Sequence, residues 1–323
     1  MRIALFRIFS YLDTPSLIQV SCVSKDWCRV SRHPSLWKHV TLENRAISSE
    51  FMVTLSQWCT QTQSLSLQGL NGRGISADES PEDYQANLRG SLEPGLERFL
   101  SSCQNTITCL YIFDCDNLLT DKCLWLVSGY CRLLTKLTYQ SKSDPITPQL
   151  MWALGGGCPG VTSLFVQPKY PCDKIISMNN RCLLLIGQFY KDLQEVGLGG
   201  KEFDIAGLLP FVQSCQRLKF ILFDHCMTIT NDSATALCRT GLKNLHTLHI
   251  IGANVEAKAL QTFQGNCRQL KTVVVKMKLQ DCVEDPSKKK DKENYKKMVK
   301  ALEALKTKAG IGNIFRLEAG PPE

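Results

Sequence analysis

The sequence predicts an α/β solenoid, with a parallel sheet on the concave face and helices outside, preceded by a small three-helix segment. Two observations support this architecture. An apolar pattern recurs along most of the chain, whereas residues 1–42 follow a helical periodicity instead. The 323 residues, with 44% hydrophobic content, are also enough to bury a large core.

The recurring pattern places apolar residues three, six and eight positions after the start of each unit. From Cys131 these residues are Leu134, Leu137 and Tyr139. The same spacing follows Gln104, Cys158, Tyr190, Cys215, Leu242 and Cys267, and a weaker unit starts at Cys59. The last two positions alternate as in a short strand, and the chain then returns as a helix. Units of about 26 residues are typical of leucine-rich repeats, and about eight stacked units bury one continuous core.

The chain contains 16 cysteines, and their spacing favours buried, reduced thiols. Disulfide scaffolds are typical of small secreted domains, and Arg7 interrupts the only apolar stretch near the N-terminus. Zinc sites use close C-x-x-C pairs, which are absent from the sequence. We therefore predict no metal site, no cofactor, and a cytoplasmic and/or nuclear location. No stretch approaches the ~18 apolar residues of a membrane span.

Several units begin with cysteine, as at Cys131, Cys158 and Cys215. They resemble the cysteine-containing class of leucine-rich repeat, in which a second cysteine follows the strand, as Cys115 and Cys226 do here. The resemblance implies that these thiols fill tight corners of the solenoid. A catalytic thiol is the alternative, but the five histidines are scattered and no activating group recurs beside a cysteine. We therefore predict no catalytic residue.

Two segments interrupt the repeats. Residues 71–95 hold an insert rich in Gly, Ser and acidic residues, which predicts a solvated loop, with a loop regulated by serine phosphorylation as the alternative. A second loop is predicted at residues 281–293. It begins a basic loop and helix at about residues 281–308, in which one helix face is apolar. That face consists of Tyr295, Met298, Val299, Leu302 and Leu305, and a closing strand follows at Ile314, Phe315 and Leu317.

The net charge of +8 comes mostly from this basic segment. Nine lysines and four acidic residues lie between Asp285 and Lys308, and the rest of the chain is close to neutral. A general nucleic-acid-binding domain would carry its basic residues over one face, and the rest of this chain does not. We therefore expect no specific nucleic-acid partner. The lysines are either the solvated face of the last repeat's helix or a basic patch for nuclear import or an anionic surface.

Residues 1–42 do not follow the repeat and predict three short helices. The apolar stripe of the first helix is Leu5, Ile8, Phe9 and Leu12. The second helix is marked by Leu17, Val20, Val23 or Ser24, Trp27 and Val30, and the third begins after Pro34 with Leu36, Trp37 and Val40. The stretch from Leu5 to Leu42 resembles an F-box. The matching elements are Ile8-Phe9-Ser10-Tyr11-Leu12, Leu17, Val20, Val23, Trp27 and Pro34-Ser35-Leu36-Trp37. An F-box ahead of leucine-rich repeats is the arrangement of the F-box/leucine-rich-repeat proteins.

This resemblance implies a role in ubiquitin transfer. In the family, the F-box docks on the Skp adaptor of a cullin-RING (SCF) ubiquitin ligase, and the repeats hold a protein substrate for ubiquitination. The chain would be a non-catalytic subunit, with residues 1–45 as the F-box and residues 46–323 as the substrate-binding solenoid. Its adaptor-facing residues would be Leu5, Ile8, Phe9, Leu12, Leu17, Val20 and Trp27.

The family pattern opens with Leu-Pro-x-Glu, and this opening is absent. Met1 stands where the proline belongs and Ile3 where the glutamate belongs. We interpret the segment as an F-box truncated at its N-terminus, in a shortened isoform or a fragment of a longer protein. The alternative function is therefore a leucine-rich-repeat scaffold or competitor that binds substrate without recruiting the ligase.

Residues five, seven and nine positions after each start should point outward on the concave face of the sheet. Six of them are candidates for substrate binding: Tyr111, Phe113, Phe165, Phe220, Leu222 and His249. Large apolar side chains on an exposed sheet indicate a protein-binding surface. The alternative is that the insert, the C-terminal tail or a neighbouring repeat covers them.

Overall fold

The computed structural model describes residues 2–115, 117–170, 172, 178–283 and 285–321. The chain divides into two compact units. The first is built mainly on residues 1–144, the second mainly on residues 161–170 and 174–323, and the helix α8 (Pro148–Gly157) is divided between them.

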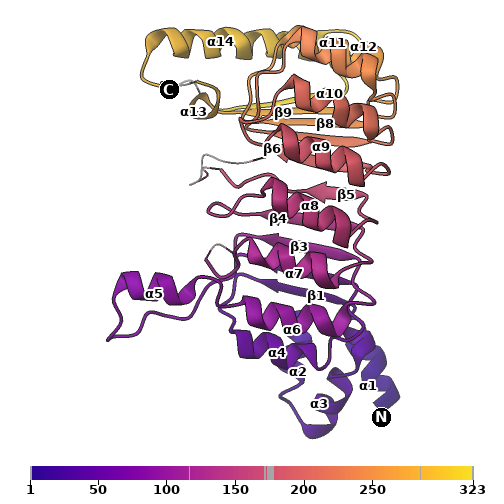
Figure 1. The fold of residues 1–323 in the computed structure, drawn as a ribbon, viewed down its shortest axis with the longest axis vertical. Coiled ribbons are helices and arrows are strands. Elements are labelled where there is room, and N and C mark those ends of the chain that lie inside the picture. The colour runs from indigo at the N-terminus through magenta and orange to yellow at the C-terminus, as the bar shows by residue number, and fades with distance from the viewer. Residues whose placement is uncertain (1, 116, 171, 173–177, 284, 322–323) are drawn as a thin grey trace. The chain divides into compact units, whose positions relative to one another are not determined.

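The first unit begins with short helices and continues into four parallel strands, with β1 paired to β2, β2 to β3 and β3 to β4. Its helices α4, α6 and α7 pack side by side along the strands (Figure 1). The elements are α1 (Arg2–Phe9), α2 (Thr14–Val20), α3 (Lys25–Ser31), η1 (Pro34–Trp37), β1 (His39–Glu43), α4 (Ser49–Ser56), β2 (Ser64–Gln68), α5 (Pro81–Leu88), α6 (Glu93–Cys103), β3 (Cys109–Phe113), α7 (Lys122–Tyr130) and β4 (Lys136–Gln140).

The second unit repeats the same arrangement with six parallel strands, each paired to the next. Its helices α9 to α12 pack in succession along them (Figure 1). The elements are β5 (Ser163–Phe165), α9 (Asn180–Phe189), β6 (Glu195–Gly199), α10 (Ile205–Ser214), β7 (Phe220–Asp224), α11 (Asn231–Thr240), β8 (Thr247–Ile251), α12 (Ala257–Asn266), β9 (Thr272–Met277), α13 (Leu279–Cys282), α14 (Lys289–Glu303), η2 (Ala304–Thr307) and β10 (Phe315–Ala319).

The register of the strands confirms the predicted repeat. Leu110 of β3 pairs with Leu137 of β4, and Val196 of β6 pairs with Ile221 of β7. All four stand six positions after the start of a unit, and all are buried. Because successive side chains on a strand point to opposite faces, the intervening residues lie on the face away from this core, which we call the open face.

The prediction of a third helix after Pro34 is wrong. Pro34–Trp37 is a single 3₁₀ turn, and the chain then enters β1. Trp37, Val40 and Leu42 follow Pro34 at the repeat's own offsets of three, six and eight, and Val40 pairs with Leu65 of β2. The parallel sheet therefore starts inside the range of residues 1–45 that we assigned to the F-box.

The predicted second helix is in fact two helices, α2 and α3. The break follows from capping, because the Ser24 side chain accepts the backbone N–H of Trp27 at 3.2 Å and so starts a new helix. Asp13 caps α2 in the same way by accepting the N–H of Ser16 at 2.9 Å.

The prediction that residues 71–95 form only a solvated loop is also wrong, because the insert contains α5. Ser80 caps this helix by accepting the N–H of Asp83 at 3.1 Å, and Pro81 occupies its first turn. A polar composition obscured the helix, since α5 has no buried residue.

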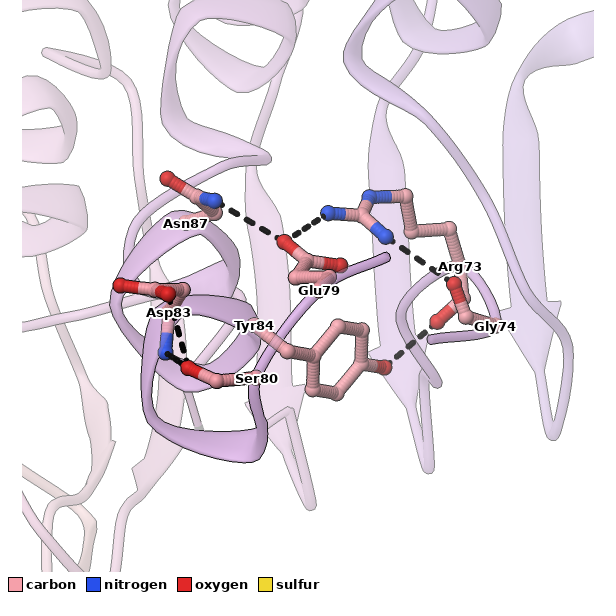
Figure 2. A network of polar contacts seen from close by, with 7 residues as sticks. All are labelled: Arg73, Gly74, Glu79, Ser80, Asp83, Tyr84 and Asn87. Atoms are coloured by element: carbon pink, nitrogen blue, oxygen red, sulfur yellow. Dashed lines mark hydrogen bonds and ion pairs between the residues drawn. The ribbon is translucent and has the colours of Figure 1, made fainter. Parts of the chain in front are cut away.

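A network of polar contacts holds the insert (Figure 2). Glu79 accepts hydrogen bonds from Arg73 at 2.6 Å and Asn87 at 2.9 Å, while the Tyr84 hydroxyl donates to the carbonyl of Arg73 at 2.5 Å. The hydrogen bond from Arg73, followed by that from Asn87, lowers the pKa of Glu79 to about 2. The insert is thus an ordered element of the first unit.

The loop predicted at residues 281–293 is shorter than expected. Helix α13 continues to Cys282, and α14 already begins at Lys289. The apolar face of α14 is confirmed by the burial of Tyr295 and Leu302. The predicted closing strand is β10, in which Phe315 pairs with Val273 of β9.

Candidate functional site

The helices of the N-terminal segment are held together by two of the residues predicted to face an adaptor. Phe9 and Leu17 are only 1% and 2% exposed. The Phe9 ring meets the edge of Trp27, with 5.3 Å between ring centroids. Phe9 and Leu17 are thus buried within the N-terminal segment, and their contact with an adaptor stays a prediction.

The other predicted residues leave apolar surface available. Ile8 is 58% exposed, and Leu5, Leu12, Val20 and Trp27 are half-buried. Sequence reasoning missed three further exposed apolar residues of this segment, namely Ile3, Tyr11 and Val23. Tyr11 alone of these gave a signal, because it stands three residues after Ile8, a spacing that brings side chains together on a helix face. We call Ile3, Leu5, Ile8, Tyr11 and Leu12 the α1 surface.

In the second unit, the open face brings three predicted substrate-binding residues together. The rings of Phe165 and Phe220 lie 5.6 Å apart, and Phe220 meets the edge of His249 at 4.9 Å. Burial, followed by the charge of Lys276, lowers the pKa of His249, so its ring is neutral at pH 7. We call Phe165, Phe220 and His249 the aromatic cluster.

Leu222 was also predicted to bind substrate on the open face, but its side chain is nearly buried. It stands in register with Gly197 on one side and His249 on the other, but only 8% of it is exposed. A Cβ on Gly197 would lie 2.6 Å from the Phe165 ring, so the missing side chain there makes room for Phe165.

Tyr111 and Phe113 lie on the open face of the first unit, both half-buried on β3. Their neighbours in register are polar: Ser66 and Thr138 flank Tyr111, and Gln68 and Gln140 flank Phe113. They therefore form a mixed surface in which aromatic and polar side chains alternate across the strands.

Eleven of the 16 cysteines are buried, and several of their thiols donate weak hydrogen bonds to backbone carbonyls. The Cys158 thiol points to the carbonyl of Val127 at 3.6 Å, and the Cys215 thiol to that of Tyr190 at 3.4 Å. Burial raises the pKa of both thiols to about 12. They are protonated at neutral pH and lack the thiolate that nucleophilic chemistry needs, which supports a packing role.

The ring of His225, which precedes Cys226 in the sequence, is engaged by other side chains. The Nδ1 of His225 lies 2.6 Å from Asp224 and its Nε2 lies 3.4 Å from Asp281, while its ring stacks on Tyr170 at 3.9 Å. Within the described part of the chain, no group of three or more His, Cys, Asp or Glu side chains is placed to hold a metal ion. None of the described helices is long and apolar enough to cross a membrane.

Residues 4–43 match the F-box-like family model. The chain is 41% identical over 318 residues to F-box only protein 41 of Mus musculus, and it is equally identical to that protein of Homo sapiens. Each alignment covers 98% of this chain and 36% of the relative. The chain thus spans 36% of the length of these relatives. A putative F-box/LRR-repeat protein 9 of Arabidopsis thaliana is 23% identical over 210 residues, or 64% of this chain and 78% of that protein.

Among solved structures, the leucine-rich repeat-containing protein LegL7 from Legionella pneumophila matches 87% of this chain and 91% of its own, with 12% identity and a TM-score of 0.42. The repeat register and the N-terminal family match identify the two parts of the sequence independently. The chain thus joins an F-box-like segment at residues 4–43 to the leucine-rich repeats that follow it, and over 98% of its length it is similar to F-box only protein 41.

Proposed function

We propose that this protein is a substrate-recognition subunit of an SCF-type ubiquitin ligase. The F-box-like helices dock on the Skp adaptor and, through it, on a cullin-RING ligase, while the open face of the repeats holds the protein substrate. The chain acts by bringing a substrate lysine near the ubiquitin-loaded enzyme, which raises its effective concentration. It needs no catalytic residue of its own for this role.

The observation that carries the proposal is the α1 surface. Within an F-box-like segment, Ile3, Ile8 and Tyr11 are 86%, 58% and 86% exposed. Exposed apolar residues on a short helix and in the turn that follows it are typical of a surface that a partner covers. The buried Phe9 supports this surface by packing α1 against Trp27 of α3.

The aromatic cluster supports the substrate half of the proposal. Aromatic side chains are enriched at the centres of protein interfaces, and a neutral His249 adds a hydrogen-bonding group without the cost of burying a charge. Sixteen cysteines without a disulfide suit a reducing compartment, which supports the cytoplasm and/or the nucleus as the location.

The decisive test is binding of the purified chain to purified Skp adaptor, measured by calorimetry. Ile8→Asp should weaken binding by at least about tenfold, since an apolar side chain buried on docking contributes about 1.5–3 kcal/mol. Ile8 is mostly exposed, so the variant should keep its fold. The matched control is Leu184→Asp, at a position of the second unit that is 51% exposed, and it should bind like the wild type.

Absence of adaptor binding by the folded wild-type chain, or equal binding by Ile8→Asp, would contradict ligase recruitment. The alternative function would then hold, in which the repeats act as a scaffold or competitor. Substrate capture is tested separately with Phe220→Ala and His249→Ala, and with Leu184→Ala, at an exposed position of helix α9 in the same unit, as control. Equal capture by all three variants would refute the aromatic cluster as the substrate site.

A further inference from the structure

The lysine-rich helix α14 borders a pocket that the proposed ligase function does not use. This pocket of about 510 Å³ lies in the second unit, where the loop before α12 and the start of α12 meet α14. Its apolar wall consists of Val255, Ala257, Met298 and Ala301. A second hollow of about 310 Å³ shares the walls Asn254 and Met298 with it. Asn254 is fixed there by a hydrogen bond to the carbonyl of Cys282 at 2.9 Å.

Two lysines from different helices stand at this apolar wall. Lys258 belongs to α12 and Lys297 to α14, and both are exposed. Neither forms an ion pair with a carboxylate among the described residues. Glu293 stands one helical turn before Lys297, a spacing that favours pairing, yet no ion pair joins them. Lysines beside an apolar wall and without internal partners are complementary to an acidic ligand that carries an apolar group.

The acidic residue in the pocket wall is already engaged. One carboxylate oxygen of Glu256 accepts the backbone N–H of Asn231 at 2.7 Å. Lys300 lies one turn beyond Lys297 on α14 and extends the positive surface along the helix. The rim of the pocket therefore carries two unpaired positive charges and one carboxylate that is bound to the backbone.

The residues around the pocket favour a protein ligand over a lipid surface. Helices that lie on membranes present large apolar side chains such as Trp, Phe or Leu outward. No large apolar side chain of the described α12 and α14 is exposed. A discrete pocket with an apolar wall instead suits a single side chain inserted between flanking charges, as in the groove binding of amphipathic helices.

We propose that this pocket, which we call the α12–α14 pocket, binds an acidic amphipathic segment of a partner protein. One apolar side chain of that segment inserts against Met298 and Ala301, and flanking carboxylates pair with Lys258 and Lys297. The pocket shares no residue with the α1 surface or the aromatic cluster, so the proposal holds whether or not the ligase function does.

The test uses the full chain and fluorescein-labelled helical peptides in which one Leu, Phe or Met stands between glutamates, with binding followed by fluorescence anisotropy. Two matched peptides replace either the glutamates with glutamine or the apolar residue with alanine. We expect saturable binding of at least one acidic apolar peptide, at least about tenfold weaker after either replacement and weakened by added salt.

The matching protein variants are Lys258→Gln with Lys297→Gln, and Ala301→Phe, which fills the pocket from an exposed position. Both should lower the affinity at least about tenfold. The charge-matched control, Lys191→Gln with Lys243→Gln, removes two exposed lysines elsewhere in the second unit and should leave binding unchanged.

Four outcomes would overturn the proposal. The first is no saturable binding of any acidic apolar peptide. The second is equal binding of the alanine peptide, which would show attraction by charge alone. The third is unchanged peptide binding by the lysine pair variant, and the fourth is displacement of the peptide by phosphatidylserine vesicles or a DNA oligonucleotide that bind more tightly than the peptide does.

Discussion

Trp37 joins the N-terminal helices to the first strand of the sheet, and its truncation is the sharpest test of this packing. The side chain is fully buried, its Nε1 donates to the carbonyl of Ser31 at 2.7 Å, and its ring lies 5.6 Å from that of Trp58. The Ser31 carbonyl belongs to the end of α3, whereas Trp58 follows α4. A single side chain therefore connects the F-box-like segment to the first repeat.

The expected cost has two parts. Truncating a buried aromatic residue to alanine lowers the free energy of unfolding by about 3–5 kcal/mol, and leaving the Ser31 carbonyl without its donor adds about 1 kcal/mol. Trp37→Ala should therefore destabilise by about 4–6 kcal/mol. Trp37→Phe keeps an aromatic ring but loses the donor, so its cost should be about 1–2 kcal/mol. The hydrogen bond from Thr62 to the backbone carbonyl of Trp37 remains in every variant.

Urea denaturation followed by circular dichroism measures these changes, and hydrogen exchange locates them, because repeat proteins open locally. The loss of protection should concentrate in residues 14–67. Trp152→Ala is the control, since Trp152 is 64% exposed and exposed substitutions change stability by about 0.5 kcal/mol or less. Equal unfolding midpoints for Trp37→Ala and Trp152→Ala, or a Trp37→Phe variant as stable as the wild type, would refute the reasoning.

Two further predictions concern the insert and the thiols. Because the pKa of Glu79 falls from its usual 4.5 to about 2 in the folded chain, its pairing with Arg73 stabilises the insert fully above pH 4.5 and is lost as the pH falls toward 2. The hydrogen-exchange rate of residues 73–89, corrected for intrinsic rates, should rise as the pH falls from 4.5 toward 2. In Glu79→Gln the rate should already be higher than in the wild type at pH 6. A wild-type rate that does not change with pH would contradict this prediction. Among the thiols, the exposed Cys22 should react with iodoacetamide in the native protein well before the buried Cys215. Mass spectrometry measures the two reaction rates, and equal rates would refute the difference in burial.

The repeat was predictable because it depends on local periodicity. Residues at offsets three, six and eight must be apolar wherever a short strand and the turn before it face the same core. The register of Leu110 with Leu137 follows from those offsets without any knowledge of long-range contacts. The same offsets occur from Pro34 onward, where the resemblance to an F-box ending led us to predict a helix instead of β1.

The helix in the insert was not predicted because it is held by polar contacts, which produce no repeating apolar pattern in the sequence. The cap at Ser80 and the proline after it were visible in the sequence. The pairing of Glu79 with Arg73 and Asn87 brings together residues whose spacing matches no repeat. Those contacts depend on the path of the folded chain, which apolar periodicity does not report.

The sequence by itself determined the type of each repeating element, the face of each strand that enters the core, and the presence of an F-box-like segment. Tertiary structure decided which members of that segment remain on the surface: Phe9 is interior and Ile8 is exposed, although both lie on the predicted apolar stripe. It also decided that Leu222 is covered while Phe220 meets His249. Periodicity orients a side chain relative to its own helix or strand, but its exposure depends on what the rest of the chain packs against it.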